Sequence, residues 1–128
     1  LPENFAGVAS LSGAVDVAAT VDRLSKEEHF NAPVFQSIYG TGDIYGSDND
    51  LFTLLDRAVS SGKKLPQMYQ WCGKQDFLYQ DNLHLRDKLL EAGAPLTYEE
   101  ADGDHQWVYW DRGIARVLDW IMEQLNAK

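Results

Sequence analysis

Two turns of this chain carry the side chains best suited to chemistry, an acid in one and a histidine in the other. Asp76 lies four residues after the apolar segment QMYQWC (67–72), and His105 lies four residues after LTYEEA (96–101). A carboxylate that accepts a hydrogen bond from an imidazole fixes its tautomer and stabilises its protonated form, which is how a hydrolytic triad orients its base. Asp76 and His105 are therefore candidates for such an acid and base.

Each of these residues also has a non-catalytic interpretation. His105 could be a hydrogen-bonded structural histidine, and Asp76 could cap its own turn, which is the commoner role of an aspartate there. Asp102, Asp104 and His105 together suggest a metal site. A hard cation needs several converging oxygen ligands, however, and DGD is also an ordinary turn. We therefore predict no metal at this turn.

The segments around the two turns alternate between strands and helices. Apolar runs bounded by Gly, Pro and Ser predict strands, and apolar residues at helical spacing predict helices. The predicted strands are 5–12, 67–72 and 96–101, and the predicted helices are about 51–59, 80–92 and 107–126. The stretch between the first strand and the first helix is mixed and turn-rich, and we assign no element to it. The last helix is expected to bury one face, formed by Trp110, Ile114, Val117, Leu118, Ile121 and Leu125.

This alternation predicts an α/β fold in which right-handed crossovers connect parallel strands. The turns that follow neighbouring parallel strands meet at one edge of the sheet, so we expect Asp76 and His105 to lie close together. Three strands make a thin parallel sheet, because such sheets are normally covered on both faces and have more strands. We therefore expect further strands to come from polypeptide outside this chain.

Composition limits the classes of function. The 128 residues suit a single domain spanning 1–128, and the 45% hydrophobic and 24% charged residues are ordinary for a soluble globular protein. A net charge of −9 without a basic stripe argues against nucleic-acid binding. Cys72 is the one cysteine, which excludes an intrachain disulfide and suits a cytoplasmic location. No apolar run predicts a membrane span or a signal peptide, although Leu1 is not a natural start residue.

Two motifs together make a family resemblance specific. WCGKQDFLYQDN (71–82) with GDHQWVYW (103–110) resembles the esterase D-like branch of the α/β-hydrolases, which includes tributyrin esterases and related feruloyl and S-formylglutathione hydrolases. FAGVASLSGAVD (5–16) and GSDNDL (46–51) resemble further elements of that branch. The resemblance covers nearly the whole chain but only the second half of the family's catalytic domain. It implies a three-layer α/β/α fold of which this chain is the C-terminal part, with an N-terminal portion completing the sheet.

The resemblance assigns Asp76 as the acid and His105 as the base of a Ser-His-Asp triad. In α/β-hydrolases a serine precedes both, in a G-x-S-x-G turn between strand and helix. No G-x-S-x-G occurs in these 128 residues, and Ser10 and Ser12 fall within or at the end of a predicted strand. We therefore expect an N-terminal polypeptide to supply the serine, and this chain alone to be inactive.

The implied activity is hydrolysis of carboxylic esters with short acyl or cinnamoyl-type groups, and it requires no cofactor. Phe77, Leu78 and Trp107 are the expected substrate-pocket residues, although each could equally serve packing or brace the loop of His105. The alternative function is that of a catalytically inactive module that serves binding or assembly, which the missing serine turn favours. An open edge on the first strand also predicts self-association, so a homo-oligomer is a further expectation.

Overall fold

The three strands described by the structure pair in chain order and run parallel. The computed structural model describes residues 4–126. Its elements are β1 (Gly7–Leu11), α1 (Val17–Leu24), α2 (Ala32–Tyr39), α3 (Leu51–Ser60), β2 (Gln67–Gly73), α4 (Tyr79–Glu91), β3 (Leu96–Ala101) and α5 (Trp107–Asn126). The expected α/β fold with a parallel sheet is confirmed. The helices α1 and α2 occupy the stretch to which the sequence assigned no element.

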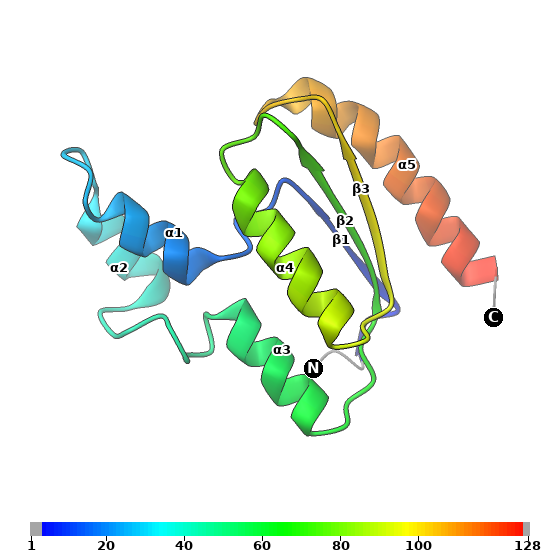
Figure 1. Cartoon of the computed structure of the whole chain (residues 1–128), viewed down its shortest axis with the longest axis horizontal. Coiled ribbons are helices and arrows are strands. Elements are labelled where there is room, and N and C mark those ends of the chain that lie inside the picture. Colours follow the sequence, from blue (N-terminus) through cyan, green and yellow to red (C-terminus); the bar gives the residue numbers. More distant parts are fainter. Residues whose placement is uncertain (1–3, 127–128) are drawn as a thin grey trace.

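Helices cover the sheet on both faces (Figure 1). α5 lies along one face, and α3 and α4 lie on the other. α1 and α2 lie together on the side of the molecule away from α5. β2 and β3 are adjacent and parallel, with Trp71 opposite Glu99 and Gly73 opposite Ala101. The turns that follow them therefore meet at one edge of the sheet.

The central strand divides the core into two clusters. Successive side chains of a strand point to opposite faces of its sheet, so β2 contributes to both. The cluster on the α5 face consists of Tyr69, Trp71, Val117 and Trp120. The cluster under α3 and α4 consists of Val15, Leu55, Leu85, Leu89 and Ala94, with Met68 packed against it. Burying both faces of β2 explains why apolar residues of QMYQWC fall on both faces of the strand, Met68 on one and Tyr69 and Trp71 on the other.

Helices α1, α2 and α3 start at polar residues that satisfy free backbone N–H groups. The Asp16 carboxylate accepts a hydrogen bond from the Ala19 N–H at 3.0 Å at the start of α1, and Asp50 accepts one from Phe52 at 3.1 Å at the start of α3. Side-chain acceptors at this position stabilise a helix because its first four N–H groups have no partner within it. The predicted helix at about 51–59 is confirmed as α3.

The buried face of α5 differs from the predicted one. Val117 and Trp120 are the buried residues, whereas Ile114, Leu118 and Ile121 are exposed. The prediction was wrong for these three. The side of α5 that faces the sheet carries Val117 and Trp120, and Ile114, Leu118 and Ile121 lie beside it on the helix surface. Leu125 lies outside the described side chains. Within residues 4–126, no helix is both long and apolar enough to cross a membrane.

Candidate active site

Asp76 and His105 are in contact at the carboxyl edge of the sheet. The Nδ1 atom of His105 lies 3.0 Å from Oδ2 and 3.2 Å from Oδ1 of Asp76. The Asp76 side chain is fully buried, whereas that of His105 is 34% exposed. With Nδ1 donating to the carboxylate, the second ring nitrogen, Nε2, keeps a free lone pair on the more accessible residue. This arrangement can orient an imidazole as a proton acceptor.

The acid is held by the turn that connects β2 to α4. The Asp76 N–H donates to Gly73 O at 3.1 Å, the Tyr79 N–H donates to Asp76 O at 3.0 Å, and the Leu78 N–H donates to Asp76 Oδ1 at 2.9 Å. The last of these bonds lets Asp76 cap its own turn, whereas the N-cap residue of α4, Leu78, makes no side-chain cap. Asp76 therefore both caps its turn and contacts His105, because Oδ1 accepts from the Leu78 N–H and both carboxylate oxygens lie near His105 Nδ1.

The turn of Asp76 and the loop of His105 are joined backbone to backbone. Lys74 N–H donates to Ala101 O at 2.9 Å, and Gln75 N–H donates to Gly103 O at 3.0 Å. The side-chain oxygen of Gln75 accepts the Gly103 N–H at 2.6 Å. The approach is so close that a Cβ at Gly73 would lie 2.6 Å from the Gly103 carbonyl carbon and closer still to its oxygen. Gly73 is thus required by the loop contact, which fixes the separation of acid and histidine.

Aromatic rings surround the imidazole of His105. Phe77 lies on one side, with ring centroids 4.7 Å apart, and Trp110 meets the imidazole edge-on at 4.8 Å. Trp107 contacts Trp110 at 5.2 Å but is itself 80% exposed. Such ring contacts limit the rotation of the imidazole and so support the orientation that Asp76 imposes.

A cavity of about 320 Å³ opens beside His105. On the sheet side it is bounded by the loop after β1, with Ser12 and Ala14, and by the turn after β2, with Phe77 and Leu78. The far wall comes from α1 and α2, through Val17, Thr20, Val21, Phe35 and Tyr39. The lining is mainly apolar, with a titratable group at one end, which is the usual character of a small-molecule site.

The structure brings together most of the residues singled out in the sequence. Asp76 and His105 touch, and Phe77 and Leu78 line the cavity, while Trp107 is not among the residues that line it. Their roles in catalysis and substrate binding stay predictions. Sequence reasoning missed the wall from α1 and α2, since it assigned no helix there. It also missed Gln75, for which the sequence offers no signal beyond its place beside Asp76.

One other titratable group near the site, the Cys72 thiol, has a structural explanation. Burial raises the pKa of the Cys72 thiol to about 11, although the Ser12 hydroxyl beside it acts in the opposite direction. A fully buried thiol with a raised pKa is unreactive. In the part of the chain that the structure describes, no three His, Cys, Asp or Glu side chains are grouped so as to hold a metal ion.

Comparison with known proteins places this geometry in context. No protein-family model matches the chain. An acetyl esterase from Caldicellulosiruptor saccharolyticus is 29% identical over 122 residues, which cover 93% of this chain and 46% of that protein. The crystal structure of S-formylglutathione hydrolase from Staphylococcus aureus is 36% identical over 91% of this chain, with a TM-score of 0.76. The chain is homologous to esterases of the α/β-hydrolase family.

Two further structures agree with that relationship. The fluorophosphonate-binding serine hydrolase F of Staphylococcus aureus, in its substrate-bound form, is 37% identical with a TM-score of 0.77. A ferulic acid esterase at 18% identity and a TM-score of 0.68 shares the α/β-hydrolase fold. The chain spans less than half the length of each of these relatives, between 42% and 46%. Its three parallel strands and flanking helices thus match part of the α/β-hydrolase fold.

Proposed function

We propose that this chain contributes the acid, Asp76, and the base, His105, to a serine carboxylic ester hydrolase. The nucleophilic serine lies on polypeptide outside the chain. The observation that carries the proposal is the 3.0 Å contact between His105 Nδ1 and Asp76 Oδ2 in a chain homologous to esterases. Fold alone would not support it, since one fold hosts many chemistries.

The geometry suits acyl transfer in two steps. As the serine hydroxyl attacks the ester carbonyl carbon, Nε2 of His105 takes its proton, and the imidazolium then gives that proton to the departing alcohol oxygen. Water next attacks the acyl-serine with His105 again as base, and the proton returns to the serine oxygen as the carboxylic acid leaves. Asp76 holds the ring and stabilises the imidazolium throughout. No step requires a cofactor.

The cavity beside His105 supports small or flat acyl groups as substrates. Its volume of about 320 Å³ and apolar walls suit a short acyl chain or a cinnamoyl ring. These are also the kinds of ester named for the relatives, an acetyl esterase and a ferulic acid esterase. Phe77 and Leu78 would contact the substrate, whereas Trp107, from its exposed position, would act through Trp110.

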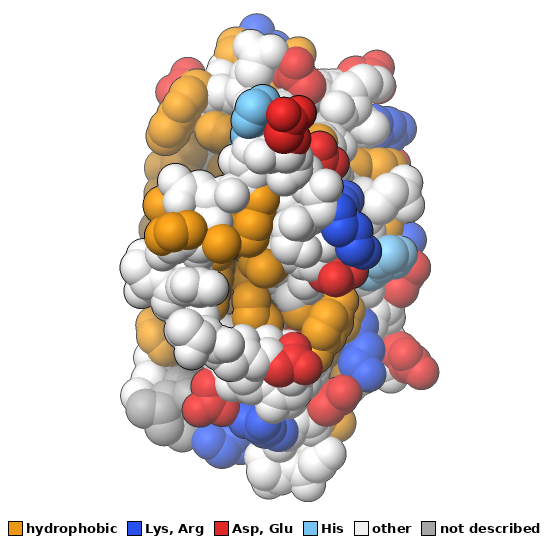
Figure 2. Space-filling view, turned by 90° about the vertical axis from the view of Figure 1, so that its left-hand side faces the viewer, with side chains coloured by type: hydrophobic (Ala, Val, Ile, Leu, Met, Phe, Trp, Pro, Cys, Tyr) orange, Lys and Arg blue, Asp and Glu red, His pale blue; other side chains and the backbone are white. Residues whose placement is uncertain are grey.

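The missing polypeptide has a place to dock. The outer edge of β1 pairs with no described strand, and Val8 on it is 49% exposed. Figure 2 shows apolar side chains gathered in a hollow on one face of the molecule. Beside the edge of β1 lies a groove of about 680 Å³ between the sheet, α3 and α4. An unpaired edge next to an apolar groove is suited to an added strand and a covering helix.

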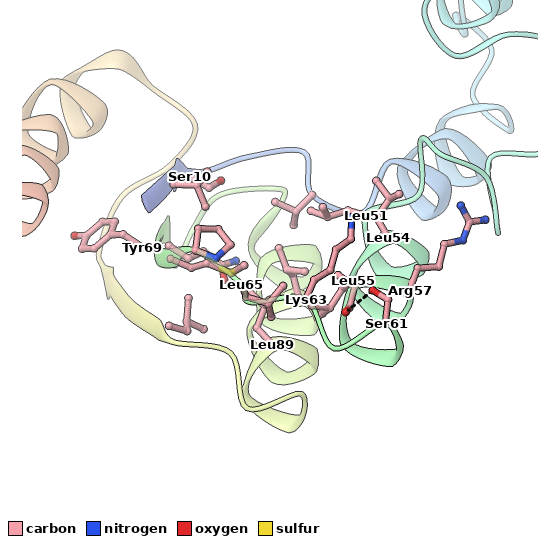
Figure 3. A pocket seen from close by; sticks show the side chains of 18 residues that line it. Ser10, Leu51, Leu54, Leu55, Arg57, Ser61, Lys63, Leu65, Tyr69 and Leu89 are labelled. Carbon is pink, nitrogen blue, oxygen red and sulfur yellow. Dashed lines mark hydrogen bonds between the residues drawn. The ribbon is translucent and has the colours of Figure 1, made fainter. Parts of the chain in front are cut away.

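Leucine is the commonest residue in the walls of this groove. Leu51, Leu54 and Leu55 project from α3, and Leu89 projects from α4 toward them, while Arg57 points away (Figure 3). Leu51 is 42% and Leu54 39% exposed, which is unusual for leucines grouped together. The relatives are more than twice as long as the matched region, so they contain the mass needed to cover such a surface. We assign the groove to the polypeptide that carries the serine.

Intact-mass spectrometry of natively purified material first tests whether the serine lies on polypeptide outside this chain. We expect either a second polypeptide or one longer chain that contains G-x-S-x-G. The complete assembly should hydrolyse p-nitrophenyl acetate, p-nitrophenyl butyrate or ethyl ferulate. Asp76→Asn should lower kcat by about 10⁴-fold, as in a serine protease triad. Asp111→Asn removes the same charge from an exposed site on α5 and should leave kcat unchanged.

Hydrolysis by the assembly that survives His105→Ala and Asp76→Asn would refute the assignment of acid and base. Docking is tested separately. Leu54→Asp should weaken the association with the serine-bearing polypeptide, whereas Leu90→Asp, on an exposed part of α4 outside the groove, should not. Equal effects of the two substitutions would refute the groove as the docking surface.

A further inference from the structure

The side chain of Asn82 is completely buried and makes hydrogen bonds to three separate segments. Its Nδ2 donates to Gly13 O at 3.0 Å and to Leu78 O at 2.9 Å. Its Oδ1 accepts from Gln70 Nε2 at 3.0 Å. Both donor hydrogens of the amide and its oxygen are therefore used, and the residue is 0% exposed.

These three partners belong to different parts of the fold, and Gly13 lies 69 positions from Asn82 in the chain. Gly13 lies in the loop after β1, Gln70 lies in the middle of β2, and Leu78 lies at the start of α4. A helix residue of this kind is costly to bury unless every polar atom is paired, because an unpaired buried amide loses its hydration without compensation. The full pairing fixes Asn82 in one orientation and, with it, the distance between the loop of Gly13 and the turn of Leu78.

That distance is also the width of the cavity beside His105. Ser12 and Ala14, on either side of Gly13, form one part of its lining, and Phe77 and Leu78 form another. Asn82 itself is not among the lining residues, and its nearest link to the acid is through Leu78, whose N–H donates to Asp76 Oδ1. It can thus set the position of two walls without touching a substrate.

We infer that Asn82 is a positioning residue that determines how well an acyl group fits the cavity. The link of this inference to ester hydrolysis rests on the proposed function. The acid and base do not depend on it in the same way. Their two loops are joined by the contacts of Lys74 and Gln75 with residues 101–103, on the far side of the turn. Loss of Asn82 should therefore affect substrate binding more than the proton transfers.

The test uses Asn82→Asp and Asn82→Ala in the complete enzyme, with Val117→Ala as the control for lost stability. Asn82→Asp keeps the size of the side chain but turns an acceptor toward two carbonyl oxygens. Because a carboxylate buried there endangers folding, Asn82→Ala is the second variant. Val117 is a buried core residue of α5, on the other face of the sheet, and it lines neither the groove nor the cavity, so its truncation destabilises the fold without removing a wall residue.

We expect both Asn82 variants to raise KM for p-nitrophenyl butyrate by about ten-fold, comparable to losing a methylene contact in an apolar pocket. The kcat and its pH profile should stay near those of the wild type, and Val117→Ala should change neither KM nor kcat at temperatures where it is folded. An unchanged KM in Asn82→Ala, or an equal rise in Val117→Ala, would overturn the inference.

A second readout separates this inference from the proposed function. Binding of methyl butyrate can be followed by the NMR signals of Phe77 and His105, and it should weaken about ten-fold in Asn82→Ala but not in Val117→Ala. If the enzyme hydrolyses no ester yet the binding difference is present, the proposed function fails and the positioning role stands. If methyl butyrate binds the wild type and Asn82→Ala equally, the positioning role fails.

Discussion

Gly73→Ala is the sharpest test of how the acid and histidine loops are joined. A Cβ at this position would lie 2.6 Å from the Gly103 carbonyl carbon and nearer still to its oxygen, against about 3.4 Å for ordinary contact. Both neighbours are backbone atoms, so no side chain can rotate away. One loop must move by close to 1 Å, which strains or breaks the hydrogen bonds between Gln75 and Gly103.

The expected cost follows from that displacement. Overpacking a close-packed site costs about 1–3 kcal/mol, and each lost hydrogen bond adds about 1 kcal/mol. We therefore expect Gly73→Ala to reduce the free energy of unfolding by about 2–4 kcal/mol, where 2 kcal/mol is already about a 30-fold change in the folded-to-unfolded ratio. Urea denaturation at pH 7 measures it, and the NMR signals of the His105 ring report whether its contact with Asp76 survives.

Gly42→Ala is the matched control for this substitution. Nothing lies within 4 Å of a Cβ at Gly42, and its φ is outside the left-handed range, so alanine fits without strain. It should leave stability unchanged or raise it by about 0.4–1 kcal/mol through the unfolded state. Equal stability of Gly73→Ala and Gly42→Ala, with unaltered His105 signals, would refute the idea that close backbone approach sets the acid–histidine distance.

Three further predictions concern other parts of the fold. Burial tends to raise the pKa of Asp50, but hydrogen bonds from Gly46, Thr53 and Phe52 outweigh it and lower that pKa. Asp50→Ala should thus reduce the free energy of unfolding by about 1 kcal/mol at pH 7, as measured by urea denaturation. The difference in stability between the wild type and this variant should shrink as the pH falls below 3.8 and through the lowered pKa of Asp50, because the native carboxylate is then protonated. A difference independent of pH would contradict this. Folding raises the pKa of Cys72 from 9.0 to about 11, so the folded protein should react with iodoacetamide at pH 8.5 at least about 100-fold more slowly than the protein in urea. The free energy of unfolding should also fall as the pH rises from 9 toward 11, because the thiol of the unfolded chain ionises first. Trp120→Phe removes the hydrogen bond from Nε1 to Thr97 and should lower the melting temperature by an amount equivalent to about 1 kcal/mol, whereas an unchanged melting temperature would show that this bond is dispensable.

The sequence predicted the sheet and the acid–histidine pair because both depend on local periodicity and chain order. QMYQWC and LTYEEA form neighbouring parallel strands, and that alone brings the turns of Asp76 and His105 together. The relationship to esterases came from the motifs around these same turns, and the comparisons agree with it.

The parts that the sequence did not predict depend on contacts between distant segments. α1 and α2 have eight residues each, which is only about two helical turns of pattern, and α2 has no buried residue. Val117 and Trp120, rather than the wider predicted stripe, face the sheet because one helix face can pack against only a few strand residues. The contact of Gln75 with Gly103 joins residues 28 positions apart and has no local signature.

The two sides of the cavity beside His105 should differ in how easily they open. The acid and histidine belong to the β2–α4–β3 unit, whose helix buries Asp81, Asn82, Leu85 and Leu89, while the opposite wall belongs to α1 and α2, which bury two residues between them. Local opening is easiest where few side chains are buried, so amide hydrogens of α2 should exchange with solvent long before those of β2. The cavity can then open and reshape from one side, admitting acyl groups of different size, while the proton-transfer pair stays in a part of the protein that opens only on global unfolding.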